Sequence, residues 1–414
     1  MITIGNGCGF WGDDLQAPAK LAPFVDVMTL DYLSELSLSI LANQQEKDPS
    51  LGYAKDCFEV IKSLLPFFKK KKFLIVTNGG GFNPLGLAKK IKAEAPDLKI
   101  AAITGDDVRD TLKNKELYTA NAYLGAYSIA EAIQNGADIV ITGRVADPSM
   151  TLGPLIAHYG WKDFDLLAQG TLAGHLIECG AQVTGGLRED WVDLPDLANI
   201  GFPIVEVESD GSFVLTKPEQ TGGIVDKTSV ALQMVYEIGD PSKYLSPDVT
   251  ADFTQVDLEE VGRNRVAVTG AKGSAPPKTL KVVGTSKAGY EAKGTLALYG
   301  GNVRQKGEKI AEVLLERLKH FSFDKVDVSL VGYGAVGPLK ENPRYLRETL
   351  LRVAARCQTK EPLEAFARSF APFVTGGPNG VTGYVNPRGE IRPIFGFWSG
   401  TIDRNQVKEE VIWI

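Results

Sequence analysis

The sequence predicts an α/β protein with an N-terminal domain over residues 1–195, built on a doubly wound, mostly parallel sheet, and a second α+β lobe over residues 196–414. In the first ~190 residues, short β-branched runs alternate with amphipathic stretches of helical spacing, which is typical of βαβ units. Beyond residue 195 the runs are shorter and are separated by polar residues, as in antiparallel strands. A chain of 414 residues with 44% apolar residues can bury two cores of this kind.

The N-terminal elements follow from hydrophobic periodicity. Apolar runs with β-branched residues predict strands at residues 2–4, 25–30, 73–77, 100–104 and 137–142. Apolar residues three and four positions apart predict helices at residues 33–41, 85–95 and 128–135. Strands that alternate with helices in this order favour a parallel sheet.

The C-terminal half predicts strands at residues 204–207, 213–216, 266–269, 279–283, 294–298 and 325–331. Helices are predicted at residues 309–319, 345–357 and 362–370. The segment 374–398 is dense in glycine, proline and aromatic residues. We expect that segment to pack back on the first domain.

Composition excludes several classes of protein. The 45 Lys and Arg against 51 Asp and Glu give a net charge of −6, which repels nucleic acid and anionic membrane surfaces. Four widely spaced cysteines form no C-x-x-C pair, so neither a zinc site nor a disulfide framework is indicated. The N-terminus lacks the pattern of a signal peptide, and no run of about 20 apolar residues is present. We therefore expect a cytoplasmic protein.

Polar clusters follow several predicted strands, and this edge of an open α/β sheet is where ligands bind. The clusters contain Asn6 and Asp13 after the first strand, Asp31 after the second, the loop from Asn78 to Asn83, and the pair Arg144 and Asp147. From these positions we expect a substrate-binding set that consists of Asn6, Asn78, Gly79, Gly80, Gly81, Asn83, Arg144 and Asp147.

Two interpretations of the glycine-rich loop Asn78–Asn83 stay open. Its backbone N–H groups can hold an anion at the start of the following helix, or the glycines serve a tight turn from strand to helix. The loop has neither the G-x-G-x-x-G spacing of dinucleotide-binding folds nor the Gly-Lys-Ser/Thr of phosphate-binding loops.

Two of the charged residues have equally open roles. Arg144 and Asp147 are three residues apart, a spacing that allows either an internal ion pair or a clamp for a substrate carboxylate. Asp13 either caps a helix or takes part in catalysis.

The chain has only three histidines, which excludes a histidine-rich metal site. Helical spacing places His175, Glu178 and Cys179 on one face, so Glu178 can orient the imidazole, which then acts as a base or activates the thiol. The alternative is a histidine packed in the core. The catalytic candidates are His175, Glu178, Asp13 and Asp31.

Segments along nearly the whole chain resemble the acyclic terpene utilisation (AtuA) family. In the first half they are GNGCGFWGDD (5–14), LDYLSELSLSILA (30–42), VTNGGGFNP (76–84), NAYLGAYSIAEAI (121–133), GADIVITGRVADPSMTLGPLI (136–156) and QGTLAGHLIECGAQVTGG (169–186). Later segments are DLANIGFPIVEV (196–207), TKPEQTGGIV (216–225), YEIGDPSKYLSPDV (236–249) and GPNGVTGYV (377–385). The resemblance implies an α/β protein linked to the catabolism of branched acyl-CoA or organic acids, and it supplies no mechanism.

The resemblance also has one departure. Longer family members carry an additional C-terminal domain that this sequence lacks, so a separate small AtuA-related subunit is an expected partner. We expect a homo-oligomer from size alone.

Two functional hypotheses follow. The first is an enzyme that uses acid/base chemistry for hydration, dehydration or hydrolysis of a small carboxylate or acyl-CoA, without a redox cofactor; if a metal is needed, the oxygen-rich residues favour Mg²⁺. The second is a non-catalytic subunit that binds acyl-CoA.

Overall fold

The computed structural model describes residues 1–71, 73–114, 116–339, 346–383 and 390–414. The chain forms two compact units: unit 1 comprises Met1–Thr285 together with Phe397–Ile414, and unit 2 comprises Ser286–Gly396. The two units do not divide at residue 195, where the boundary between domains was predicted. The strands that follow residue 195 continue the sheet of the first unit.

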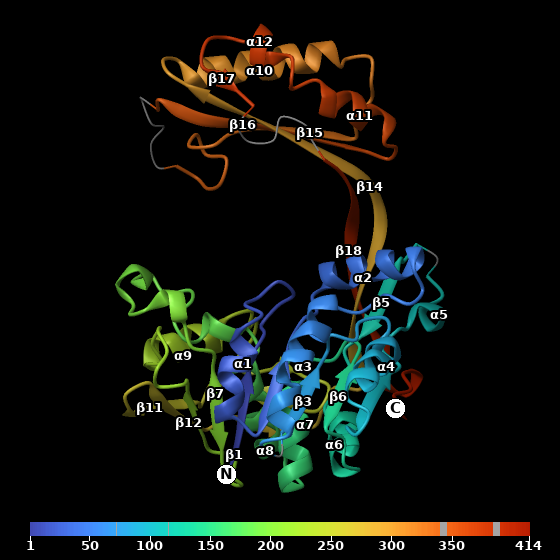
Figure 1. Cartoon of the computed structure of the whole chain (residues 1–414), viewed down its shortest axis with the longest axis vertical. Helices are drawn as coiled ribbons and strands as arrows, with labels where there is room; N and C mark the ends of the chain where they lie inside the picture. Colours follow the sequence, from blue (N-terminus) through green and yellow to red (C-terminus); the bar gives the residue numbers. More distant parts are fainter. Residues whose placement is uncertain (72, 115, 340–345, 384–389) are drawn as a thin grey trace. The chain divides into compact units, whose positions relative to one another are not determined.

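Five neighbouring parallel strands form the centre of the sheet in unit 1, in the order β1, β2, β3, β6 and β4 (Figure 1). Their bounds are Ile2–Asn6, Val27–Leu30, Leu74–Thr77, Ile139–Thr142 and Ile100–Thr104. Nearly all of their residues are buried, which explains their continuous apolar runs. The predicted mixed α/β class and the parallel strands are therefore confirmed, whereas the doubly wound arrangement stays a prediction.

Antiparallel strands extend this sheet on both sides. Next to β1 lie β7 (Ile204–Val207), β8 (Phe213–Thr216), β12 (Arg265–Thr269) and β11 (Asp257–Gly262). On the other side, β19 (Glu410–Trp413) pairs with β4. The sheet thus has ten strands, of which the central five are parallel.

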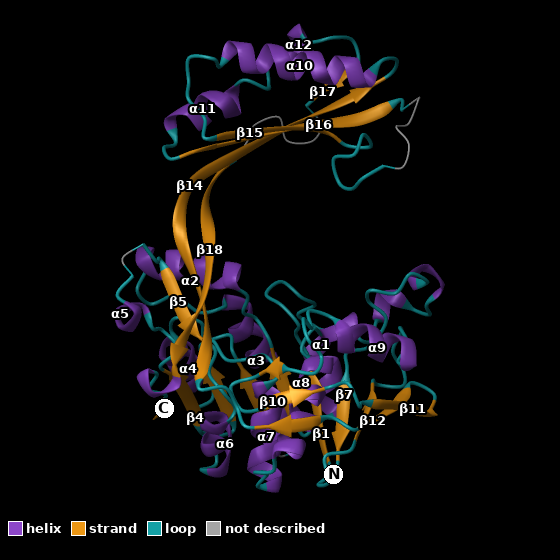
Figure 2. Cartoon of the chain, turned by 180° about the vertical axis from the view of Figure 1, so that it is seen from behind, coloured by secondary structure: helices purple, strands orange, loops and turns teal. Residues whose placement is uncertain are grey.

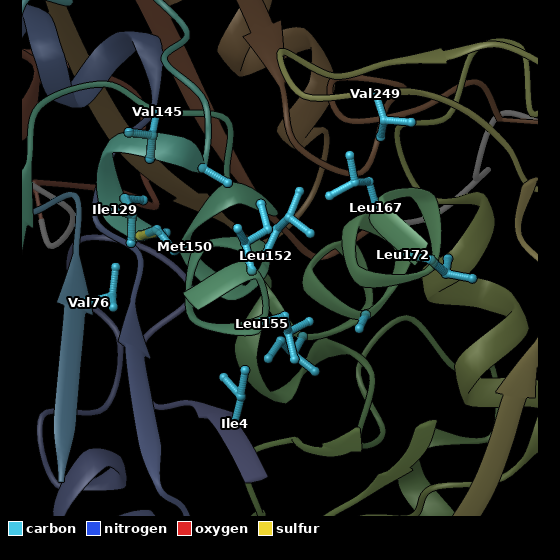
Figure 3. Packing of buried hydrophobic residues seen from close by; sticks show 14 of the residues in the cluster. Ile4, Val76, Ile129, Val145, Met150, Leu152, Leu155, Leu167, Leu172 and Val249 are labelled. Atoms are coloured by element: carbon cyan, nitrogen blue, oxygen red, sulfur yellow. The ribbon is translucent and has the colours of Figure 1, made fainter. Parts of the chain in front are cut away.

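The helices of unit 1 are α1 (Ala17–Leu21), α2 (Glu35–Lys47), α3 (Lys55–Phe68), α4 (Pro84–Glu94), α5 (Arg109–Leu112), α6 (Tyr127–Gln134), α7 (Ser149–Tyr159), α8 (Phe164–Ile177) and α9 (Lys227–Val235). Side-chain caps begin several of them: Ser34 forms a capping box at α2, and Asp163 accepts backbone hydrogen bonds at the start of α8. Helices α7 and α8 are apolar and bury most of their residues beside Ile4 and Val76 of the sheet (Figure 3).

Short strands complete unit 1. They are β5 (Thr119–Ala122), β9 (Tyr244–Leu245), β10 (Thr250–Asp252), β13 (Lys272–Ser274) and the first part of β14 (Thr279–Tyr299). The two predicted strands at residues 279–283 and 294–298 are parts of this one long strand, because the residues between them are also extended and residues 290–293 already pair with β16.

Unit 2 has its own sheet and its own core (Figure 2). Its elements are the second part of β14, α10 (Val303–Arg317), β15 (Lys325–Leu330), β16 (Glu348–Cys357), α11 (Glu361–Arg368), α12 (Phe373–Gly376), β17 (Val381–Thr382) and the first part of β18 (Ile391–Asp403). The strands lie in the spatial order β15-β16-β14-β17. Along the chain, α10 lies between β14 and β15, and α11 and α12 lie between β16 and β17, which follows the β-α-β-β-α-β pattern. The chain leaves unit 1 through β14 and returns through β18.

The prediction of a helix at residues 345–357 is wrong, and residue 345 itself lies outside the described residues. The segment forms β16, in which Thr349, Leu351, Val353, Ala355 and Cys357 are buried alternately. Leucine, alanine and arginine favour helices, but this period of two fits a strand with one buried face. Tertiary burial therefore decides the structure of this segment.

Among the described residues, no helix combines the length and the apolar character that crossing a membrane requires.

Candidate functional site

Two adjoining hollows in unit 1 form one cleft at the carboxyl ends of the parallel strands. The first, the polar pocket, has a volume of about 340 Å³ and is lined by residues that include Arg144, His175 and Lys281. The second, the apolar chamber, has a volume of about 1010 Å³ and is lined by residues that include Phe10 and Ile40. Both hollows share a dividing wall, formed by Leu33, Ser34, Asp147, Glu178 and Glu237.

Arg144 is the buried cation of the polar pocket. It follows β6, and only 3% of its side chain is exposed. Its Nη1 lies 3.0 Å from Asp147 Oδ1 and also donates to the carbonyl oxygen of Leu33 at 2.5 Å. Its guanidinium carbon lies 4.1 Å from the centre of the Tyr123 ring. Burial alone would lower the pKa of Arg144, but Asp147 and the other acids nearby raise it overall, so the guanidinium is charged.

Lys281 is a second cation beside the same aromatic ring. Its Nζ is 4.7 Å from the centre of the Tyr123 ring and lines the polar pocket. Tyr123 in turn donates from its hydroxyl to Glu35 Oε1 at 3.1 Å. Two cations therefore face one small cavity, and Arg144 Nε has no hydrogen-bond partner within the described part of the chain. This arrangement suits one carboxylate group.

His175 and Glu178 form the predicted pair. His175 Nε2 lies 3.1 Å from the backbone carbonyl oxygen of Gln233, and its Nδ1 lies 3.1 Å from Glu178 Oε1. A carbonyl oxygen can only accept, so Nε2 carries a proton and Nδ1 faces the carboxyl group. Both ring nitrogens are therefore engaged by the protein, one by Glu178 and one by Gln233.

Glu178 lines both hollows, and its second carboxyl oxygen is not bound by the described part of the protein. This oxygen, Oε2, is buried. Burial raises the pKa of Glu178 to about 7, although His175 opposes the increase. A carboxyl group with this pKa can accept or donate a proton near neutral pH.

The predicted activation of Cys179 by His175 is wrong. Burial raises the pKa of the Cys179 thiol, and the neighbouring Glu178 raises it further. The thiol is therefore protonated at neutral pH and is no activated nucleophile.

Asp31 is a second buried carboxyl group beside the cleft. It lines the apolar chamber with 5% of its surface exposed, and Asn78 Nδ2 donates to its Oδ1 at 2.7 Å. Burial raises the pKa of Asp31 well above its usual range, and the nearby charge of Asp147 adds to the increase. Burial therefore favours the protonated form of Asp31, and the hydrogen bond from Asn78 holds the carboxyl group in place.

Asn6 positions the end of α8. Its Nδ2 donates to the backbone oxygens of Ile177 at 2.8 Å and Glu178 at 2.7 Å. Its Oδ1 accepts from Thr29 at 3.1 Å. Asn6 is fully buried and does not line the cleft, so the predicted contact with substrate is not found. Asn6 instead holds the backbone at Glu178 in place.

Asp13 lies at the rim of the apolar chamber. It accepts hydrogen bonds from the backbone N–H groups of Gly9 and Asp14, each at 2.8 Å. Helix α1 begins later, after Gln16, so Asp13 closes a turn and caps no helix.

The glycine-rich loop after β3 is a packed turn, and the prediction of an anion-holding loop is wrong. The N–H groups of Gly79, Gly81 and Asn83 already donate to oxygen atoms of the same loop and of β3. A Cβ atom at Gly80 would lie 2.6 Å from the carbonyl oxygen of Thr142. The loop lines neither hollow of the cleft.

Asn83 has a structural role at the end of this loop. Its Oδ1 accepts from Gly86 N–H at 2.9 Å and so caps α4, while Nδ2 donates to the carbonyl oxygen of Leu51 at 3.0 Å. Both polar atoms of the Asn83 side chain are therefore hydrogen-bonded to the protein.

Several cleft residues were not expected from the sequence: Tyr123, Glu237, Tyr244 and Lys281. Tyr123 follows β5, and Lys281 lies on β14, which pairs with β5 although the two strands are far apart in the sequence. No local motif marks Tyr123 and Lys281, and their contribution depends on this long-range pairing. In the described ranges, no group of three or more His, Cys, Asp and Glu residues is arranged to hold a metal ion.

Unit 1 therefore has the features of an α/β protein that binds a small molecule at the carboxyl edge of a parallel sheet. A family model described as "Acyclic terpene utilisation family protein AtuA" matches residues 2–413. The chain thus belongs to the AtuA family, which is associated with acyclic terpene utilisation. No curated protein and no solved structure matches the chain.

Proposed function

We propose that this protein is an enzyme that uses Glu178 as a general acid/base to add or remove water on a carboxylate or acyl substrate, or to hydrolyse such a substrate. The observation that carries the proposal is the buried Glu178 Oε2, which lacks a partner among the described residues at the wall between two hollows. The pKa of Glu178, raised to about 7, supports proton transfer by this atom near neutral pH.

His175 acts as a positioning residue in this proposal. With Nε2–H bonded to the carbonyl oxygen of Gln233, a single proton lies between His175 Nδ1 and Glu178 Oε1. The pair is then either imidazolium with carboxylate or imidazole with carboxylic acid. Starting from imidazolium with carboxylate, Oε2 can take a proton from the substrate or from water, which gives imidazolium with carboxylic acid. The same Oε2–H group can then return that proton to the product, which restores the starting pair.

Arg144 and Lys281 bind the negatively charged end of the substrate. Arg144 Nε has no hydrogen-bond partner among the described residues, and Arg144 and Lys281 both line the polar pocket, so a carboxylate or an enolate oxygen that contacts both lowers the repulsion of the two cations. Stabilising negative charge beside the proton acceptor is what removal of a proton next to a carbonyl group requires. The proposed chemistry needs no redox cofactor.

The test is proton exchange in D₂O. We expect the protein to exchange the proton at the carbon next to the carboxyl group in a panel of 3-hydroxy and 2,3-unsaturated acids and their CoA thioesters, followed by NMR. Glu178→Gln keeps the shape of the side chain and should lower exchange and turnover at least ~100-fold.

Leu15→Ser is the matched control, because Leu15 is exposed and does not line the cleft. Full turnover by Glu178→Gln would contradict the proposal. Binding of the acyl compounds without turnover in the wild type would favour a non-catalytic binding subunit instead.

A further inference from the structure

The two hollows of the cleft differ in charge and in surface character, and this difference bears on the class of substrate. The polar pocket is lined by Arg144 and Lys281. Among the described residues, no lysine or arginine lines the larger apolar chamber, which instead has five carboxyl groups at its surface: Asp13, Asp31, Asp147, Glu178 and Glu237. A group with several phosphates therefore finds no cation in the chamber among the described residues.

The apolar chamber also gathers large hydrophobic side chains that are exposed to solvent. Four of its lining residues are Phe10, Leu36, Ile40 and Leu187, with exposed fractions of 60%, 52%, 38% and 54%. Exposed apolar side chains that cluster around a cavity mark a binding surface more often than scattered ones do. Leu36 and Ile40 lie four residues apart on α2, so they present one face of that helix to the chamber.

The chamber is continuous with the proposed reaction site. Asp147 and Glu178 belong to both hollows, so a molecule bound at Arg144 can extend past Glu178 into the chamber. The volume of about 1010 Å³ is at the upper end of the range for small-molecule sites. These observations favour a small molecule over a macromolecule as the occupant.

We infer that the substrate is a free carboxylic acid with an uncharged aliphatic chain, and that it is not a CoA thioester. This inference rests on the proposed function and refines it. The carboxylate lies between Arg144 and Lys281, and the chain lies in the apolar chamber against Leu36 and Ile40. The nucleotide part of CoA carries several phosphate charges, for which the acidic chamber offers no cation among the residues that the structure describes.

Calorimetric binding of straight-chain acids from acetate to decanoate tests the inference. We expect the dissociation constant to fall about fourfold for each methylene group that enters the chamber. We also expect the free acid to bind at least ~10-fold more tightly than the matching CoA thioester, since the thioester removes the carboxylate and adds phosphates.

The double variant Leu36→Ser/Ile40→Ser should reduce this dependence on chain length to less than about twofold for each methylene group, while acetate binds as before. Both side chains are exposed, so the variant should fold, and Leu15→Ser serves as the control with a comparable exposure outside the cleft. An unchanged chain-length dependence in the double variant would overturn the inference. Tighter binding of the thioester would also overturn it.

The assay separates this inference from the proposed reaction. Glu178→Gln should still bind decanoate, because the variant keeps the chamber and both cations. If the chain-length dependence appears but Glu178→Gln retains turnover, the chamber assignment stands and the catalytic role of Glu178 fails. If Glu178→Gln loses turnover but chain length has no effect on binding, the catalytic role of Glu178 stands and the chamber assignment fails.

Discussion

The loops after β3 and β6 begin at the same edge of the sheet, on two strands that pair with each other in parallel. Both were expected to contact the substrate. The loop after β3 turns its polar atoms inward and bonds them to the protein, whereas the loop after β6 places Arg144 and Asp147 at the cleft. Position at the end of a strand is therefore insufficient to define a site; a polar group must also be left available there.

The largest expected effect concerns the loop after β6. Arg144→Gln combined with Asp147→Asn should lower kcat/KM about 100-fold, because it removes the cation that binds the carboxylate without leaving Asp147 as an unpaired charge. Steady-state kinetics with the acid identified in the binding series measures this. A decrease below threefold would remove the functional difference between the two loops.

Gly80→Ala in the loop after β3 should lower stability and leave kcat/KM unchanged. The added Cβ meets the carbonyl oxygen of Thr142 at 2.6 Å, so we expect a loss of about 1–3 kcal/mol in the free energy of unfolding, measured by urea denaturation. The kcat/KM of the folded fraction should stay the same. Gly239→Ala is the matched control, because its added Cβ has no atom within 4 Å.

The pH dependence tests which member of the His175–Glu178 pair acts in the cleft. If Glu178 accepts the proton, kcat/KM rises with pH as its carboxyl group ionises, with a midpoint near its pKa of about 7. His175 lowers the pKa of Glu178, so His175→Gln should move the midpoint to higher pH. A midpoint that stays in place would show that His175 does not tune Glu178.

The smallest expected effect concerns Asn83. Asn83→Ala removes the cap of α4 and should lower the free energy of unfolding by about 1 kcal/mol, with no change in kcat/KM. Urea denaturation and kinetics on the same preparation measure both quantities. A loss of activity would mean that the loop after β3 contributes to the cleft after all.

The sequence was most informative where a single local pattern decides the structure. The parallel strands and α4 were predictable because their residues are buried as continuous runs or at helical spacing. The contact between His175 and Glu178 also follows from helical spacing. Which of the two faces the cleft depends on the carbonyl oxygen of Gln233, from a different helix, and this could not be predicted locally.

Long-range pairing accounts for the rest of what the sequence did not reveal. Lys281 reaches the cleft only because β14 pairs with β5, which places it at the ring of Tyr123. The strand β16 has the composition of a helix, and only its partners β14 and β15 establish it as a strand. Contacts of this kind depend on the whole fold and leave no local motif.

The pairing of β19 with β4 has a consequence for biosynthesis. Unit 2 is inserted between the two segments of unit 1, so the ribosome must complete all of Ser286–Gly396 before Glu410–Trp413 exists to cover the edge of β4. Until then that edge has unpaired backbone groups and can pair with another nascent chain. The inserted unit has a core of its own, so its elements can fold during this delay.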